Sequence, residues 1–149
     1  MREVGAIGLT VGDLDRELMF YTNTLPFELV SISETSGREQ DALLDLSDVK
    51  MRVAMLKLGD ERITLTEHLA NKGRPIPADS RSFDHWFQVF WNTRLAVDDV
   101  AKLSAKLHER GVAFVSKPSS AHSQIVRDPD GHAMQLDEVS AVAAASAQR

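Results

Sequence analysis

The stretch that decides the fold is IGLTVGDLDRELMFYTNTLPFELV, residues Ile7–Val30. Its first part belongs to an apolar run, Val4–Val11, which favours a strand. Apolar residues then recur at helical spacing over Asp13–Asn23, and aspartates at the start can cap a helix there. A second strand-like run follows at Phe27–Ser33. The stretch therefore predicts a strand, a helix and a returning strand.

The same pattern returns in LAVDDVAKLSAKLHERGVAFVSKP, residues Leu95–Pro118, where Leu95 lies 86 residues after its counterpart Leu9. A strand is predicted over Gln88–Val97 and a helix over Asp98–Arg110, where Gly111 ends the apolar helical spacing. A short strand, Val112–Val115, follows. The chain therefore carries two copies of one supersecondary pattern.

Each copy continues with two more strands joined by a turn. The first copy has Met51–Leu58 and Arg62–Glu67, and the second has Ser123–Arg127 and His132–Asp137. The second turn, Asp-Pro-Asp-Gly at residues 128–131, is typical turn chemistry. Each copy is thus β-α-β-β-β. We expect the copies to pair because neither can cover both faces of its sheet alone.

Composition sets the module boundaries. We place module one at residues 1–68, a linker rich in Gly, Pro and Ser at 69–86, and module two at 87–138. The Ala- and Ser-rich end, 139–149, is expected to be a tail. The whole chain is predicted to be one domain.

Charge and residue usage exclude several classes of protein. The chain has 149 residues, a formal net charge of -5, 43% hydrophobic residues, 26% charged residues and no cysteine. The sequence has no cluster of basic residues of the kind that binds nucleic acid, and no apolar run long enough to span a membrane. The absence of cysteine excludes disulfides and thiolate chemistry, so we expect a cytoplasmic protein.

The doubled pattern resembles the vicinal oxygen chelate superfamily, which groups glyoxalase I, extradiol dioxygenases and bleomycin-resistance proteins. The resemblance lies in Ile7–Val30, Gly59–Phe87, Leu95–Pro118 and RDPDGHAMQLDE, Arg127–Glu138. It implies an α+β fold in which two tandem β-α-β-β-β modules form curled mixed sheets around a cavity. Some members close that cavity with two chains, so the resemblance also implies a homodimer.

The resemblance implies four positions for metal ligands, on the first and last strands of each module. In this sequence they are Ala6, Thr64, Asn92 and Gln135. Alanine cannot bind a metal, and hydroxyl and carboxamide groups are weak ligands without an anionic partner. We therefore expect no metal and no other cofactor. A rearranged metal site built from His68 and His85 is kept as an alternative, although no histidine pair shows metal-ligand spacing.

Side chains alternate across a strand, so residues that share parity with the metal positions are predicted to face the cavity. Arg94 and Asp137 are among them. We expect either that Arg94 forms a buried ion pair with Asp137 or Glu138, or that Arg94 holds an anionic ligand. The aromatic residues near the second module offer cavity walls, with core packing as the alternative. The predicted ligand-binding set is Ala6, Thr10, Thr64, Phe90, Trp91, Asn92, Arg94 and Gln135.

Two functions are consistent with these residues. The first is a metal-independent protein that binds an oxygen-rich or aromatic small molecule, as bleomycin-resistance proteins do. The second is an enzyme of the same superfamily, a lyase, isomerase, cyclase or dioxygenase with an altered or absent metal site. For an enzyme, Asp137 is the candidate base and Arg94 the candidate stabiliser of an oxyanion.

Overall fold

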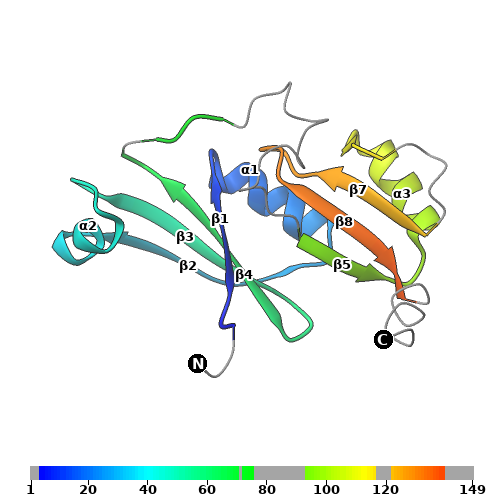
Figure 1. The fold of residues 1–149 in the computed structure, drawn as a ribbon, viewed down its shortest axis with the longest axis horizontal. Coiled ribbons are helices and arrows are strands. Elements are labelled where there is room, and N and C mark those ends of the chain that lie inside the picture. Colours follow the sequence, from blue (N-terminus) through cyan, green and yellow to red (C-terminus); the bar gives the residue numbers. More distant parts are fainter. Residues whose placement is uncertain (1–3, 71, 76–92, 117–121, 140–149) are drawn as a thin grey trace. The chain divides into compact units, whose positions relative to one another are not determined.

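The computed structural model describes residues 4–70, 72–75, 93–116 and 122–139. The chain divides into two compact units, Met1–Pro75 and Ile76–Arg149. Each unit contains one four-stranded sheet, coloured blue to green in the first unit and green to red in the second (Figure 1). The predicted α+β fold with two repeated modules is confirmed.

The first unit has the strand order β1-β4-β3-β2, in which β1 runs parallel to β4 and the other neighbours are antiparallel. The parallel pair places Gly8 opposite Thr64. The elements are β1 (Ile7–Val11), α1 (Leu14–Met19), a π-helical segment η1 (Phe20–Thr24), β2 (Glu28–Ser36), α2 (Arg38–Leu44), β3 (Lys50–Leu58) and β4 (Glu61–His68).

The second unit repeats this topology with the strand order β5-β8-β7-β6, and β5 runs parallel to β8. Here Arg94 lies opposite Gln135, so this pair is the repeat equivalent of Gly8 and Thr64. The elements are β5 (Thr93–Val97), α3 (Val100–Glu109), β6 (Ala113–Phe114), β7 (Ser123–Arg127) and β8 (Ala133–Glu138).

One face of each sheet is buried under helix, and we call the opposite face the open face. Along β4, Ile63 and Leu65 are buried while Thr64 and Thr66 are partly exposed. Along β8, Leu136 is fully buried, as is Leu107 of α3. The predicted alternation is therefore present, and the open faces carry the polar residues.

Aspartates begin both repeat helices, as predicted. The Asp13 side chain accepts a hydrogen bond from the backbone N–H of Arg16 at 3.0 Å, and Asp99 accepts one from Lys102 at 2.7 Å. An ion pair also ties α1 to the sheet, because Arg52 of β3 contacts the Asp15 carboxylate at 2.8 and 3.1 Å. The contacts of Asp13 and Asp99 satisfy backbone donors that a helix start leaves unpaired.

The Asp-Pro-Asp-Gly turn is held by its own side chains. The Asp128 carboxylate accepts hydrogen bonds from the backbone N–H groups of Asp130 and His132, at 3.1 and 2.8 Å. The His132 ring lies 2.8 Å from the same carboxylate, and Gly131 has a φ of 98°, which favours glycine. His132 therefore has a structural role in fixing the β7–β8 turn.

Several element boundaries differ from the sequence predictions. Only Ile7–Val11 pairs with β4, so the first strand is shorter than predicted. The predicted first helix divides into α1 and η1, and α2 was not predicted because its residues bury no apolar face. The predicted module-two strand is observed from Thr93, since residues 88–92 lie outside the described part of the chain.

No helix within the described residues is long and apolar enough to cross a membrane.

The helix-covered face of β4 generates a prediction about stability. Leu65 is 0% exposed, whereas Leu43 of α2 is 73% exposed. Leu65→Ala should lower the free energy of unfolding by about 2–5 kcal/mol, because it removes buried methyl groups and leaves a cavity. Leu43→Ala, the matched control, should change it by less than about 0.5 kcal/mol. Urea denaturation measures both, and equal effects would contradict the assigned faces.

Candidate ligand-binding site

An ion pair on the open face of the second sheet joins two of the predicted site residues. Arg94 on β5 contacts one carboxylate oxygen of Asp137, Oδ2, through Nε at 2.8 Å and through Nη2 at 2.7 Å. The parallel pairing of β5 with β8 places these residues on the same face of adjacent strands. Arg94 and Asp137 are therefore paired, which was one of the alternatives expected from the sequence.

The other oxygen of Asp137, Oδ1, accepts two further hydrogen bonds. Ser123 Oγ donates at 2.7 Å from β7, and Gln135 Nε2 donates at 2.8 Å from two positions earlier on β8. Four donor atoms from three side chains thus surround a carboxylate whose side chain is only 5% exposed. A buried charge is tolerated when it is paired and hydrogen-bonded in this way.

Two opposing effects act on the Asp137 carboxyl. Burial raises its pKa, but hydrogen bonds from Ser123, Gln135 and Arg94, with the positive charge of Arg94, more than offset burial. The pKa of Asp137 is therefore held below its ordinary value of 3.8. At neutral pH this carboxylate is a charged acceptor that orients its donors.

Arg94 itself is largely open to solvent, with 65% of its side chain exposed. The ion pair therefore differs from the buried pair that was one of the expectations from the sequence. A guanidinium held along one edge by a carboxylate and exposed elsewhere keeps donors for a planar oxygen-rich partner. The arrangement is able to bind an anion.

Module one presents small polar groups at the equivalent positions. Thr10 is exposed and Thr64 partly exposed. A Cβ added at Gly8 would lie 3.3 Å from Thr64 Oγ1, so a larger residue at position 8 would crowd the Thr64 hydroxyl. This face therefore carries hydroxyl groups and no charge at the positions that match Arg94 and Gln135.

The described part of the chain tests the metal positions only in part. Ala6 precedes β1 and is exposed, Thr64 lies on β4, and Gln135 donates its amide to Asp137. Within residues 4–70, 72–75, 93–116 and 122–139, no group of three or more His, Cys, Asp or Glu side chains is arranged to hold a metal. An alanine, a threonine and an engaged carboxamide do not fit a transition-metal site.

The other predicted ligand-binding residues, Phe90, Trp91 and Asn92, lie outside the described residues, as does His85. Their roles stay predictions.

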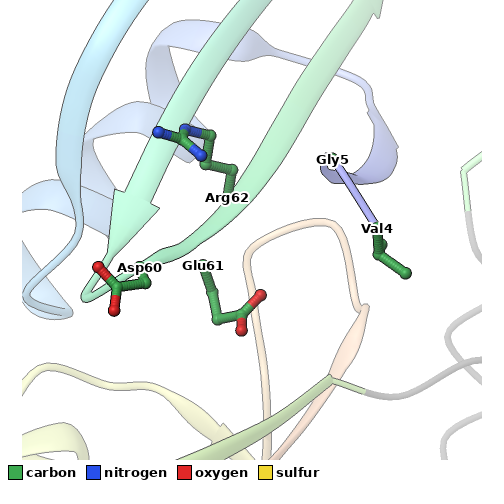
Figure 2. A pocket seen from close by; sticks show the side chains of 5 residues that line it. All are labelled: Val4, Gly5, Asp60, Glu61 and Arg62. Carbon is green, nitrogen blue, oxygen red and sulfur yellow. The ribbon is translucent and has the colours of Figure 1, made fainter. Parts of the chain in front are cut away.

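A hollow of about 290 Å³ occurs elsewhere in the first unit, at the β3–β4 turn. Figure 2 shows Asp60, Glu61 and Arg62 on the turn and the start of β4, with Val4 and Gly5 on the segment before β1. None of the predicted ligand-binding residues lines it. The residues that line this hollow therefore differ from those of the Arg94 cluster.

Ser123 was not among the residues predicted for the site. A usable signal was present, because pairing the strands on either side of the Asp-Pro-Asp-Gly turn sets Ser123 opposite Asp137. Applying antiparallel register to that hairpin would have identified it.

A family model described as the Glyoxalase/Bleomycin resistance protein/Dioxygenase superfamily matches residues 3–136. The chain belongs to this superfamily. No curated protein matches the chain.

Solved structures with low sequence identity share the fold. A trypanothione-dependent glyoxalase I from Leishmania major is 19% identical, with a TM-score of 0.74 over 99% of this chain and 94% of that one. A glyoxalase family protein from Bacillus cereus is 18% identical, with a TM-score of 0.76 over 93% and 94%. A variant of the fosfomycin resistance protein FosX from Listeria monocytogenes, complexed with Mn(II) and 1S,2S-dihydroxypropylphosphonic acid, is 18% identical, with a TM-score of 0.60 over 93% of each chain.

The lowered pKa of Asp137 generates a prediction about pH. Because the folded pKa lies below the unfolded one, the charged carboxylate stabilises the fold above the unfolded pKa, and this contribution is lost as the pH falls through the folded pKa. Wild type should therefore exceed Asp137→Asn in unfolding free energy at pH 6, and the difference should shrink below about pH 3.8.

Chemical denaturation across this pH range measures the difference. Asp60→Asn, which removes an exposed turn carboxylate, controls for the change in net charge. A wild-type advantage over Asp137→Asn that grew on acidification would contradict the hydrogen-bonded carboxylate described above.

Proposed function

We propose that the chain is a metal-independent small-molecule-binding protein in which Arg94 holds an oxygen-rich anion. The proposal rests on one observation about Arg94. Its guanidinium is held by the Asp137 carboxylate, and 65% of its side chain is exposed. An arginine positioned in advance loses less conformational freedom when it binds a ligand. A cytoplasmic location and a homodimeric assembly are part of the same proposal.

The geometry supports a planar or tetrahedral anion at the outer side of the guanidinium. Asp137 Oδ2 contacts Nε and Nη2, and no contact between Nη1 and another described residue competes with a ligand there. A carboxylate, phenolate, enolate or phosphonate supplies the oxygen atoms that such a fork binds.

Gln135 adds a second group to the proposed recognition set. Because Gln135 donates its amide to Asp137, its carbonyl oxygen can accept a hydrogen bond from a ligand hydroxyl. The ligand-binding set proposed from the sequence also includes Thr10, Thr64 and Ala6 of module one, and Phe90, Trp91 and Asn92. The hydroxyl groups of Thr10 and Thr64 are able to donate or accept a hydrogen bond.

An enzyme that uses the same cluster is the second candidate. In that proposal Arg94 stabilises an oxyanion and Asp137 accepts a proton. The role of Asp137 as a base is the weaker part of this proposal. Its carboxylate would have to give up hydrogen bonds from Ser123, Gln135 and Arg94 to accept a proton from the substrate. The network favours a positioning role for Asp137, with Arg94 as the group that touches the ligand.

Arg94→Met should strongly weaken anion binding while the chain still folds. Salicylate and phenylphosphonate serve as probes, and salicylamide is the neutral counterpart of salicylate. We expect calorimetry to show that the anions bind wild type and bind Arg94→Met about 10–100-fold more weakly, the loss of a charge-assisted hydrogen bond. Salicylamide should not bind.

Arg52→Met is the matched control, because Arg52 is also ion-paired but lies on the helix-covered side of the first sheet. It should keep wild-type affinity. Equal binding by wild type and Arg94→Met would contradict the proposal, as would failure of every anion to bind wild type. The melting temperature of Arg94→Met should fall, because the Asp137 carboxylate, whose side chain is only 5% exposed, loses two of its four donors, while the hydrogen bonds from Ser123 and Gln135 remain.

Metal independence has a separate test. Protein purified without chelator should contain no stoichiometric transition metal, and EDTA should change neither its melting temperature nor its affinity for salicylate. Bound metal near one equivalent, with melting lowered by EDTA, would contradict this part of the proposal.

A further inference from the structure

The open face of the first sheet carries two cations at the end next to the β3–β4 turn. Lys57 of β3 and Arg62 of β4 lie directly opposite each other in the antiparallel register. Opposite residues project from the same face of a sheet. Arg62 also shares its face with Thr64, two positions further along β4, and that face is the one the helices leave uncovered. Both cations therefore lie on the side of the sheet away from the core.

Arg62 has no charged partner among the described residues, whereas Lys57 has one. Lys57 Nζ contacts the carboxylate of Glu28 at 2.9 Å, and the Glu28 side chain is 71% exposed. Figure 2 shows the Arg62 side chain extending from β4 toward β3, while the neighbouring Glu61 points away from it. Asp60 belongs to the turn beyond both strands. This end of the open face thus holds two cations and one exposed carboxylate.

Cations in opposite positions repel each other, and this arrangement favours a bound anion. Like charges directly opposite destabilise a pair of strands, and an anion between them reverses the sign of the interaction. The Cα atoms of opposite residues are about 4.5–5.5 Å apart, so one anionic group is able to contact both side chains. Arginine supplies a planar fork for two oxygen atoms, and lysine supplies a point charge with three donors. The pair suits a phosphate or a carboxylate.

Hydroxyl side chains continue from the cations along the same face. The next two rows of residues across the sheet lie two and four positions away, about 7 and 14 Å at the rise of a strand. Their exposed or partly exposed hydroxyls come from β1, β4 and β2, and each hydroxyl is able to donate and accept a hydrogen bond. In the strand order β1-β4-β3-β2 the rows are Gly8, Thr64, Met55 and Ser31, and then Thr10, Thr66, Val53 and Ser33.

We propose that this face binds an anionic sugar derivative, either a sugar phosphate or a sugar acid. Its phosphate or carboxylate lies between Arg62 and Lys57, and its hydroxyls pair with Thr64 and Ser31. The cations select the anionic group, and the hydroxyl rows select a ligand that carries hydroxyls beside that group. All four residues belong to the first unit, so the proposal does not depend on the one made for Arg94.

Calorimetric titration of the full chain with ribose 5-phosphate and with gluconate tests the site. Arg62→Gln should weaken binding by about 10-fold or more, the loss of a charge-assisted hydrogen bond. Glu28→Gln should strengthen binding by about five-fold, because it removes a negative charge about 4 Å from the bound anion. Lys106→Gln, at an exposed position on α3 of the second unit, is the charge control and should leave the affinity unchanged. Circular dichroism confirms that each variant is folded.

Ribose and inorganic phosphate separate the two halves of the ligand. Each should bind wild type at least about ten-fold more weakly than ribose 5-phosphate, because each lacks one of the recognised groups. Binding of ribose 5-phosphate alone would support the site and identify the anionic group as a phosphate, and binding of gluconate alone would identify it as a carboxylate.

Two results would overturn the proposal: binding of neither compound to wild type, or wild-type affinity in Arg62→Gln. Equal affinity for inorganic phosphate and ribose 5-phosphate would overturn the assignment of a sugar. The affinity of wild type for salicylate is measured separately, so failure of this proposal and failure of the proposal for Arg94 are distinguishable.

Discussion

Parallel pairing between the first and last strand of each repeat is the constraint on which the site depends. It sets β1 beside β4 and β5 beside β8 in the same register, so that Gly8 and Thr64 in one unit correspond to Arg94 and Gln135 in the other. Helices α1 and α3 begin after these first strands, and the sheet face opposite the buried one stays available for polar groups. The repeat thus creates two sheet faces with the same backbone pairing but different side chains at equivalent positions.

On the second face the side-chain contacts centre on the buried carboxylate of Asp137. A charge in this environment needs donors, and Ser123, Gln135 and Arg94 supply them. The same contacts that stabilise the carboxylate fix the guanidinium, which remains exposed. Structural and ligand-binding roles of Arg94 are therefore compatible, because Asp137 holds one edge of the side chain and leaves the other to solvent.

Much of this arrangement was predictable from the sequence. Apolar alternation, the repeated pattern and the Asp-Pro-Asp-Gly turn predicted the eight strands and the two repeat helices, and alternation put Arg94 and Asp137 on one face. Helix α2 could not be predicted from periodicity, because it buries no apolar face. Ser123 was missed because its role depends on cross-strand register. The exposure of Arg94 depends on how neighbouring side chains cover the pair, which a pattern of residue types does not specify.

The central claim is that Asp137 fixes Arg94 so that its outer side binds an anion. Nuclear magnetic resonance of the arginine side chain tests this most directly, because the Nε–H and Nη–H groups report separately. We predict a slowly exchanging Arg94 Nε–H signal in wild type, lost in Asp137→Asn, and a shift of the Nη signals alone when salicylate is added. An Nε–H signal that exchanges as fast as those of exposed arginines, or Nη signals unmoved by salicylate, would contradict the account.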